Sequence, residues 1–523
     1  PSGLPPFDRT SRAYGLRWWV LAVLNLSLLV IIVDNSILNV AIPTLVTELG
    51  ATNSQLQWMV DSYTLVFAGL LLTAGSLGDR YGRKGALQLG MVVFGVGSLA
   101  SALIETPNQL IATRALMGIG GAFIMPATLS IITNVFPPEE RGRAIGLWAA
   151  VAGIATALGP ISGGFLIEHF YWGSIFLVNL PIVAVSLTAG AAIIPTSRDP
   201  AKPSFDPVGA VLSIVGLVLV VFAIIEAPEA GWTSSGIVAT FAAGVVVLSA
   251  FAWWEARTSS PMLDTSFFRN PRFSAASAGI MLLFFAMFGM IFLQTQYLQF
   301  VMGYDALAAG VGLLPMAVTM LLLAPNSPRL AERFGTKRVV GSGLALVGLT
   351  LVLMAGYPVD DVTYWGDVAW RLVLFAVGMS CVMAPATESI MGSLPRAKAG
   401  VGSAMNDTTR QVGGALGVAI VGSVMSSAFS NRVEDSFRAA GVAEGAIDVA
   451  RDGLGQSIQV AVRSGIPSQQ ILGLVEEAKE AFVSGLHRGV LVAAASALLG
   501  AAIAFRYLPA RASEEHEATR PHP

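Results

Sequence analysis

Six ionisable residues stand inside the long apolar runs of this 523-residue chain, namely Asp34, Asp61, Arg114, Glu388, Asp407 and Arg410. A charged side chain at membrane depth is costly, so such residues usually face a cavity or a partner. A carboxyl group in an apolar cavity can hold a proton and release it when a cation arrives. Proton and cation then compete for one site, which is the chemistry of proton-coupled exchange.

Three of these residues share a level in the first part of the chain. Counting about 1.5 Å per residue from the outer end of each predicted helix, Asp34, Asp61 and Arg114 lie roughly 8–12 Å deep. Our hypothesis is that Asp34 and Asp61 bind protons or a cationic substrate, while Arg114 tunes their proton affinity or relays charge. The alternative is a static Asp–Arg pair that braces three helices.

The other three residues lie in the second part of the chain. Asp407 and Arg410 are three residues apart on one predicted helix, about 10–15 Å from its inner end. They can pair with each other along one face, or Asp407 can bind substrate or protons. Glu388 lies nearer an inner helix end, where water can reach it, so a functional role and a solvated one both stay open.

The elements that carry these residues are predicted to be membrane-spanning helices. Hydrophobic residues make up 54% of the chain and charged residues 12%, whereas soluble proteins carry roughly a quarter charged residues. Apolar runs of about 20 residues recur, and they are continuous rather than alternating, which indicates helices and not a barrel. We predict fourteen helices, at 18–40, 56–76, 84–104, 109–131, 142–167, 173–194, 207–226, 235–254, 273–300, 307–325, 338–356, 368–390, 400–425 and 487–507.

The distribution of charge predicts the orientation. An even number of helices puts both termini on one side, and most of the 31 basic residues fall in segments on that side. The positive-inside rule therefore predicts cytoplasmic N- and C-termini. The segment 427–486 is placed outside despite its basic residues, because long loops cross largely regardless of charge. Its end, near 469–486, has apolar positions at helical spacing, which predicts a partly helical surface element.

An internal repeat divides the chain. The turn at Asp79–Lys84 is echoed at Glu332–Lys337, and Pro126-Ala-Thr-Leu-Ser-Ile is echoed by Pro385-Ala-Thr-Glu-Ser-Ile, with Glu388 in place of Leu129. Two homologous bundles that rock around a shared site would give alternating access. The predicted division is a cytoplasmic segment at 1–17, a six-helix bundle at 18–196, two inserted helices at 207–254, a second six-helix bundle at 273–507 containing the extracytoplasmic loop, and a cytoplasmic tail at 508–523.

The first of these turns carries a motif made of Gly75, Gly78, Asp79, Arg80, Gly82, Arg83 and Lys84. Gly75 and Gly78 lie on one helix face and permit close packing, and Gly82 suits a tight turn. Asp79 can accept hydrogen bonds from a helix N-terminus or a basic side chain of the other bundle, which would make a cytoplasmic latch. The alternative is a basic turn that only sets topology.

The predicted helix 142–167 carries small residues and a proline along one stripe, namely Gly153, Gly159, Pro160, Gly163 and Gly164. A stripe without side chains lets a partner helix approach closely, and the proline removes a backbone donor and favours a bend. Generic helix packing explains the same spacing. Aromatic and methionine residues of the predicted helix 273–300, among them Phe284 and Phe288, could line an adaptable apolar cavity, although ordinary packing explains them too.

Together these motifs resemble the fourteen-helix drug:proton antiporters of the major facilitator superfamily. The likeness covers essentially the whole chain and rests on segments 34–43, 75–84, 114–121, 153–164 and 406–414. It implies an all-α polytopic membrane protein with two six-helix bundles plus two inserted helices, located in the bacterial inner (plasma) membrane. It also implies multidrug efflux and antibiotic resistance, driven by the proton gradient without a cofactor, and a role in antiport for the stripe at 153–164.

The function expected from these features is export of amphiphilic or cationic drugs from the cytoplasm or inner leaflet in exchange for protons. A dedicated exporter of an endogenous lipid or secondary metabolite is the alternative, and uptake by proton symport is disfavoured by the stripe. No span carries a nucleophile–base arrangement, so an enzyme is not expected. The net charge of −2 argues against nucleic acid. The expected partners are the lipid bilayer, amphiphilic small molecules and protons; a monomer is compatible with the sequence. Metal ligation is not expected, because ligand spacing is lacking at Cys381, His169, His487, His516 and His522.

Overall fold

The computed structural model describes residues 12–201, 204–463 and 468–509. Within these ranges the chain is helical and has no strand. Fourteen of the described helical segments are long and apolar enough to cross a membrane, which confirms the predicted count. Of the predicted terminal segments, residues 1–11 and 510–523 lie outside the described residues.

The first group of helices forms one bundle. Contacts join α3 with α5, α4 with α5, and α2 with α6. Its members are α1 (Arg12–Gly15), α2 (Arg17–Leu49), α3 (Asn53–Tyr81), α4 (Arg83–Ala102), α5 (Pro107–Val135), α6 (Pro138–His169), α7 (Ser174–Leu177) and α8 (Asn179–Ile193).

The last group forms a second bundle, in which α11 packs on α17 and α20, and α15 packs on α16 and α20. One of its spans, Leu307–Phe334, is divided into several short helices. The members are η1 (Thr265–Arg269), α11 (Pro271–Gln296), η2 (Tyr297–Val301), α12 (Ala306–Val311), α13 (Leu314–Leu323), η3 (Ala324–Asn326), α14 (Ser327–Phe334), α15 (Thr336–Met354), η4 (Tyr364–Ala369), α16 (Trp370–Gly392), η5 (Arg396–Lys398), α17 (Ala399–Ala439), α18 (Glu444–Ala450), α19 (Leu454–Arg463) and α20 (Ser468–Tyr507).

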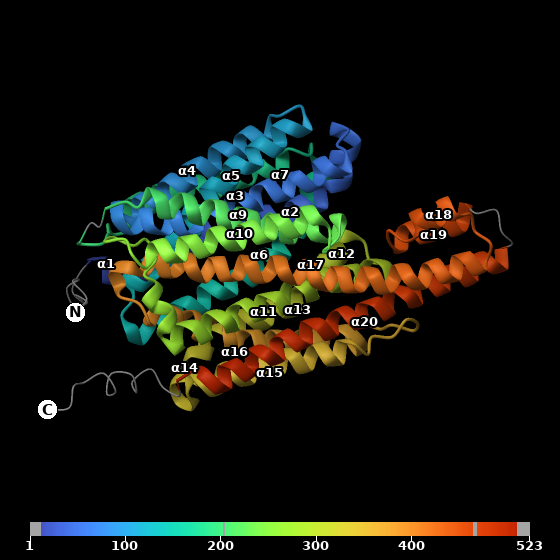
Figure 1. Ribbon diagram of the computed structural model, residues 1–523. Coiled ribbons are helices and arrows are strands. Elements are labelled where there is room, and N and C mark those ends of the chain that lie inside the picture. Colours follow the sequence, from blue (N-terminus) through green and yellow to red (C-terminus); the bar gives the residue numbers. More distant parts are fainter. Residues whose placement is uncertain (1–11, 202–203, 464–467, 510–523) are drawn as a thin grey trace.

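The two inserted helices, α9 (Pro207–Ala230) and α10 (Ser235–Glu255), form a hairpin that touches both bundles. On one side Val221 of α9 packs with Leu65 and Ala68 of α3. On the other, Val220 and Ile224 of α9 pack with Ala419 of α17. The hairpin therefore bridges the bundles where α3 and α17 run next to each other, as Figure 1 shows for α9, α10 and α17.

The helix ends follow local signals. Thr52 and Thr106 each form a capping box at the start of α3 and α5, with Gln55 and Gln109 as partners. The two repeated turns share a backbone feature, since Gly82 and Gly335 have φ of 125° and 90°. Residues that carry a side chain rarely adopt such positive φ values, so glycine is needed at both turns. The repeat seen in the sequence is thus also a repeat in backbone geometry.

The helices α17 and α20 are longer than expected. The sequence predicted helix ends near 425 and 487, whereas α17 continues to Ala439 and α20 begins at Ser468. Most of the predicted loop 427–486 is therefore helical, and the helical element expected near 469–486 is the start of α20. Leu474, Ala478 and Phe482 of this part are buried. Hydropathy missed the extensions because only one stripe of each is apolar, and that stripe packs on protein.

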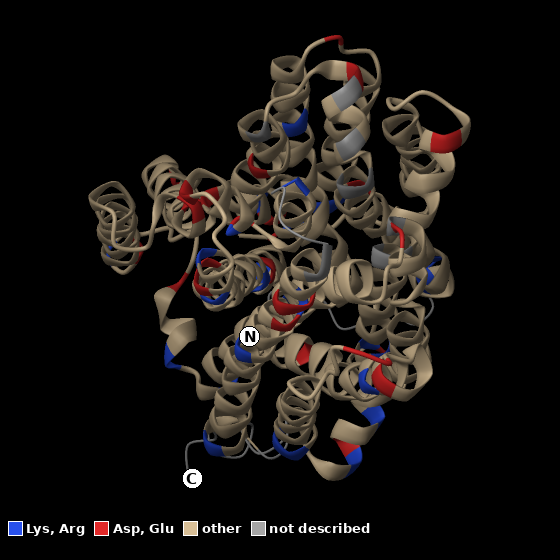
Figure 2. Ribbon diagram, turned by 90° about the vertical axis from the view of Figure 1, so that its right-hand side faces the viewer, with Lys and Arg blue, Asp and Glu red and all other residues tan. Residues whose placement is uncertain are grey.

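The start of α2 and the end of α20 lie at the same end of the molecule, which we call the terminal side (Figure 1). The opposite end, where α18 and α19 lie, we call the hairpin side. A view along the helices shows mostly uncharged ribbon, with Lys, Arg, Asp and Glu in few places (Figure 2). Each of the fourteen candidate spans contains an 18-residue window with at most two Asp, Glu, Lys or Arg residues, which fits helices embedded in a bilayer.

Candidate functional site

A buried ion pair lies at the centre of the first bundle. Asp34 of α2 is fully buried, and one of its carboxylate oxygens accepts a hydrogen bond from Nη1 of Arg114 of α5. The other oxygen accepts a hydrogen bond of 3.0 Å from Nδ2 of Asn179 of α8. Both oxygens of Asp34 are thus engaged. We call Asp34, Arg114 and Asn179 the first polar centre.

Arg114 is also fully occupied. Its Nε donates to the backbone oxygen of Met59 over 3.2 Å, and its Nη2 donates to Oδ1 of Asn35 over 3.3 Å. The guanidinium lies 4.4 Å from the centre of the Tyr63 ring, close enough for a cation–π interaction. Arg114 therefore ties α2, α3 and α5 together.

Glycine makes this arrangement possible. A Cβ added to Gly118, one turn after Arg114 on α5, would lie 2.7 Å from the backbone oxygen of Tyr63. Since real Cβ atoms do not approach so closely, α3 and α5 can come this near only with glycine at that position. The close approach brings Met59 and Tyr63 within reach of Arg114.

The first polar centre extends into α4. Nδ2 of Asn179 also contacts Oγ of Ser98 at 3.1 Å, and that hydroxyl donates to the backbone oxygen of Phe176 at 2.7 Å. Sequence reasoning missed Asn179 because it considered only ionisable residues. An uncharged amide inside an apolar run was the available signal, since a buried amide also requires partners.

Asp61 lies apart from the first polar centre, although the sequence placed it at the same depth. It makes no hydrogen bond or ion pair with either Asp34 or Arg114 in the described ranges. The charges that act on Asp61 are those of Glu226 and Glu229 on α9. Residues two positions apart are turned by roughly 200° around a helix, so Asp61 faces away from Tyr63. Counting residues along the helix predicts the depth of Asp61 but not the side of α3 on which Asp61 lies.

A second cluster of buried polar side chains lies at the seam between the bundles. Asp407 of α17 is 1% exposed; its Oδ1 accepts a hydrogen bond of 3.3 Å from Asn406, and its Oδ2 has no hydrogen-bond partner among the described residues. Arg410 donates to Oγ1 of Thr387 over 3.0 Å, and its Nε has no partner in the same ranges. We call Asp407, Arg410 and Thr387 the second polar centre.

Pairing of Asp407 with Arg410 was one of two alternatives, and no ion pair within 4.0 Å joins them in the described part of the chain, although their opposite charges act on each other. The guanidinium of Arg410 lies 4.8 Å from the ring of Trp148 of α6 and 5.1 Å from that of Phe284 of α11. Trp148 in turn donates to Oγ1 of Thr128 at 3.1 Å. Arg410 of the second bundle is thus held by an aromatic side chain of the first.

Asp79 joins the bundles at the terminal side. Its two carboxylate oxygens accept hydrogen bonds of 2.8 and 3.1 Å from the backbone N–H groups of Gly400 and Val401, at the start of α17. This is the contact that the sequence predicted for Asp79, and a helix N-terminus favours a negative charge. Arg83 lies 2.6 Å from Asp79 and donates to the backbone oxygens of Arg396 and Ala397 at 2.8 and 2.9 Å.

The glycines of this turn differ in what they contact. A Cβ on Gly75 would lie 2.6 Å from the backbone oxygen of Gly400, so Gly75 permits the close approach of α3 to α17. Gly78 instead faces Ala86 of α4, at 3.4 Å from an added Cβ. Arg80 stacks on Tyr81, and Lys84 donates to the backbone oxygen of Ala191 at 2.7 Å. These two basic residues contact their own bundle.

The stripe on α6 contacts several partners. A Cβ on Gly153 would lie 3.2 Å from the sulfur of Met320 in α13, and one on Gly159 would overlap the Ser36 hydroxyl of α2. Pro160 packs against Gly310 of α12. Gly163 is buried, and Gly164 has nothing within 4 Å of an added Cβ.

Two further glycines of α6 make the tightest contacts with the second bundle, and the sequence did not single them out. A Cβ on Gly146 would lie 2.5 Å from the backbone oxygen of Ala324, and one on Gly142 would lie 2.6 Å from Oε2 of Glu388. Glu388 therefore lies in the seam at the terminal side, where Arg141 of α6 is an opposite charge that acts on it. It is not part of the second polar centre.

Comparison with known proteins gives consistent results. The family model described as Major Facilitator Superfamily matches residues 24–418. The Multidrug efflux pump LfrA of Mycolicibacterium smegmatis is 34% identical over 94% of this chain and 97% of that protein. The Methyl viologen resistance protein SmvA of Salmonella typhimurium is 34% identical over 95% and 99%. The Tetracenomycin C resistance and export protein of Streptomyces glaucescens is 32% identical over 94% and 92%.

Solved structures agree on the fold. The human organic anion transporter MFSD10 aligns with a TM-score of 0.59 at 14% identity, covering 93% of this chain and 98% of that one. A bacterial homolog of the human lysosomal transporter Spinster aligns with a TM-score of 0.54 at 18% identity, covering 95% and 98%. At these identities the likeness concerns the arrangement of helices alone.

Proposed function

This chain belongs to the Major Facilitator Superfamily of transporters and is a multi-pass protein of the bacterial plasma membrane, and we propose that it exports amphiphilic and cationic compounds in exchange for protons. In this proposal the terminal side is cytoplasmic, as the distribution of basic residues favours. The names of two relatives, multidrug efflux pump and methyl viologen resistance protein, support this class of substrate.

The observation that carries the proposal is the fully buried pair of Asp34 and Arg114. Removing two charges from water is costly, and the pair is stable only while each charge neutralises the other. A proton that binds Asp34 cancels its charge and leaves Arg114 without its counter-ion. Arg114 must then move or find another partner, so proton binding changes the contacts among α2, α3 and α5.

The second polar centre is proposed to bind the cationic part of the substrate. Asp407 offers a carboxylate oxygen without a partner, and the rings of Trp148 and Phe284 offer faces that attract cations. In the described state Arg410 occupies those faces. A cationic substrate that stacks on Trp148 would displace Arg410, and because Trp148 and Arg410 belong to different bundles, this exchange would weaken a contact across the seam.

Opening toward the cytoplasm requires the seam at the terminal side to separate. The hydrogen bonds of Asp79 to Gly400 and Val401 would break, and the close contact of Gly146 with Ala324 would be lost. In the proposal Asp79 and Arg83 act as the latch of this gate. Glu388 contributes a second carboxyl group there, whose protonation would weaken its attraction to Arg141.

Asp61 keeps a separate role in the proposal. With Glu226 and Glu229 it gives α3 and α9 a concentration of negative charge toward the hairpin side. Such a field raises the local concentration of protons and cations. Asp61 therefore supports the approach of protons to the first polar centre without being part of it.

The membrane potential can supply free energy for export. One elementary charge that crosses a potential of 100 mV releases about 2.3 kcal/mol. Since about 1.4 kcal/mol corresponds to a tenfold ratio of concentrations, each charge moved supports a gradient of roughly 50-fold. Exchange of one proton for an uncharged amphiphile moves one net charge, so the potential can drive it without a bound cofactor. Exchange of one proton for a monovalent cation moves no net charge and is driven by the pH difference alone.

The test is ethidium transport into everted membrane vesicles, started by an imposed pH gradient. We expect accumulation with the wild-type protein and none with Asp34→Asn. Asp448→Asn is the matched control, since Asp448 lies on an exposed face of α18 and carries no role in the proposal. If the wild type transports neither ethidium nor other cationic dyes, the alternative gains, namely a dedicated exporter of an endogenous lipid or secondary metabolite.

A further inference from the structure

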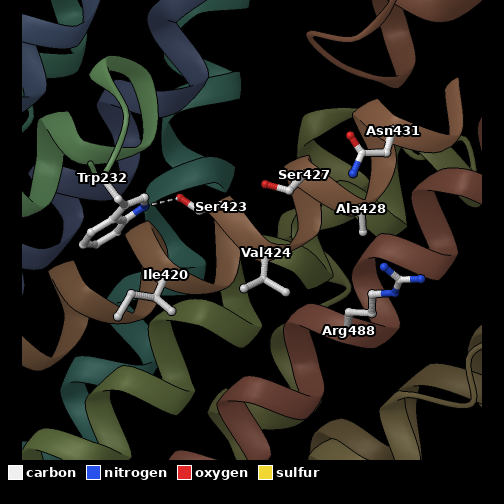
Figure 3. Close-up of a pocket in the computed structure, with 8 residues that line it drawn as sticks. All are labelled: Trp232, Ile420, Ser423, Val424, Ser427, Ala428, Asn431 and Arg488. Atoms are coloured by element: carbon white, nitrogen blue, oxygen red, sulfur yellow. Dashed lines mark hydrogen bonds between the residues drawn. The ribbon is translucent and has the colours of Figure 1, made fainter. Parts of the chain in front are cut away.

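A pocket of about 490 Å³ lies between the inserted hairpin and the second bundle, and none of its lining residues belongs to either polar centre. Three elements meet there: the turn between α9 and α10, the face of α17 toward the hairpin side, and α20 (Figure 3). The residues that line it are Trp232, Ile420, Ser423, Val424, Ser427, Ala428, Asn431 and Arg488.

The pocket depends on the helical spacing of its lining residues on α17 and on two glycines of α20. The lining residues of α17 recur every three or four positions and so share one face. On α20, a Cβ on Gly485 would lie 2.7 Å from the backbone oxygen of Met425, and one on Gly489 would lie 3.2 Å from Val421. Glycine at these positions lets α20 pack closely on α17, which places Arg488 beside the polar face.

The inserted hairpin closes one side of the pocket. Trp232 follows α9, and its Nε1 donates a hydrogen bond of 2.9 Å to Oγ of Ser423 on α17 (Figure 3). Its ring covers the end of the pocket near Ile420 and Val424, while Ser427, Asn431 and Arg488 lie toward the other end. The pocket therefore has one apolar end and one polar end.

The polar end suits an anion. Arg488 is exposed and makes no hydrogen bond or ion pair with any described residue. No carboxylate lines the pocket, and Ser427 and Asn431 add neutral hydrogen-bonding groups. A guanidinium matches a phosphate well, because its N–H groups can donate to two oxygens at once. The apolar end suits a hydrocarbon chain.

The depth of the pocket points to a lipid. Leu491, Leu498, Leu499 and Phe505 of α20 are exposed, which marks the stripe that faces hydrocarbon. Arg488 lies about 28 Å from Tyr507 at 1.5 Å per residue, close to the roughly 30 Å thickness of the hydrocarbon core. Arg488 is thus at the level of lipid headgroups on the hairpin side, where tryptophan is also favoured.

We infer that this pocket binds an anionic phospholipid, with the phosphate on Arg488 and an acyl chain along Ile420 and Val424. The lipid belongs to the leaflet on the hairpin side, which is the outer leaflet in the proposed orientation. Because Trp232 belongs to the inserted hairpin and the other lining residues to the second bundle, the bound lipid holds the hairpin against α17. The inference does not depend on the identity of the exported compound.

The experiment measures lipid binding to the full-length protein by native mass spectrometry, with phosphatidylglycerol and phosphatidylcholine added in turn. We expect Arg488→Gln to weaken the binding of phosphatidylglycerol about tenfold, the effect of losing one charged hydrogen-bonding group. Phosphatidylcholine should bind the wild type weakly and be unaffected by the substitution. Arg506→Gln is the matched control, because Arg506 lies at the opposite end of the same helix.

A second variant tests the apolar end. Val424→Trp keeps Arg488 but fills the space proposed for the acyl chain, and it should also reduce the binding of phosphatidylglycerol. Equal binding of phosphatidylglycerol to the wild type and Arg488→Gln would overturn the inference. So would inorganic phosphate at millimolar concentration that displaces the lipid completely, because the site would then recognise a free anion and not a lipid.

Discussion

The two polar centres contain the same kinds of charge but differ in how those charges are satisfied. In the first, Asp34 uses both oxygens, and Arg114 contacts Asp34, Asn35 and Met59. In the second, Asp407 has an oxygen without a partner and Arg410 lies on aromatic rings instead of a carboxylate. An ion pair whose hydrogen-bonding groups are all engaged rearranges only when one of its charges is neutralised. A centre with an unpartnered carboxylate oxygen can bind a ligand directly.

The helices explain this difference. The residues of the first polar centre lie on α2, α5 and α8, and Arg114 also contacts α3; all four helices belong to one bundle, so separation of the bundles would not by itself break these contacts. The second combines α16 and α17 with Trp148 of α6 in the other bundle. Its geometry must change whenever the bundles separate. We therefore propose that protons bind inside one bundle and that the substrate binds at the seam between the bundles.

The largest expected effect is that of Asp34→Asn. An amide cannot take up a proton, so pH-driven uptake of ethidium into everted vesicles should fall by about 100-fold or more, the contribution typical of a lost proton-transferring group. The amide keeps the shape of the side chain, and size-exclusion chromatography should show a folded protein. If Asp34→Asn kept half of the wild-type rate of pH-driven ethidium uptake, Asp34 would not be the proton-binding group and the proposed difference between the two polar centres would be wrong.

The next effect concerns stability and the seam. Gly146→Leu places a side chain against the backbone of Ala324, and it should destabilise the described state by about 2 kcal/mol, as overpacking does. The measurement is thermal unfolding in detergent. Gly164→Leu is the control on the same helix, because an added Cβ there meets nothing within 4 Å. Equal unfolding temperatures for the two variants would show that α6 does not approach the second bundle so closely.

Asp407→Asn should have a smaller effect on activity than Asp34→Asn. Loss of one charged partner for the substrate weakens binding by about tenfold, so the KM for ethidium should rise while pH-driven exchange persists at saturating dye. The measurement is the dependence of the initial rate on dye concentration. A complete loss of exchange at all concentrations would place Asp407 in the proton pathway and remove the contrast between the centres.

The smallest effect is expected for Asp61→Asn. Glu226 and Glu229 remain and keep the local charge negative, so the rate of exchange should change only about twofold, as for the loss of one charge among three neighbours. The measurement is initial ethidium uptake at low and high salt. A loss as severe as that of Asp34→Asn would support the sequence-based hypothesis that Asp61 binds protons or substrate together with Asp34.

The sequence predicted several features because they depend on local chemistry. The fourteen spans follow from apolar runs long enough to cross a membrane, and a helix N-terminus of the other bundle was one of the two kinds of partner predicted for Asp79. Helical rise predicted that Asp34 and Arg114 share one level, and the two side chains do meet. These predictions use only composition, spacing and rise, which neighbouring residues along the chain determine.

Only the tertiary structure decided which residues face each other around the helices. Asp61 faces α9 instead of Arg114, Arg410 stacks on Trp148 instead of pairing with Asp407, and Asn179 completes the coordination of Asp34. The extension of α17 to Ala439 likewise depends on the partner helix that covers its apolar stripe. The rotation of each helix about its axis results from the packing of all its neighbours, most of them distant in sequence, and no local pattern contains that information.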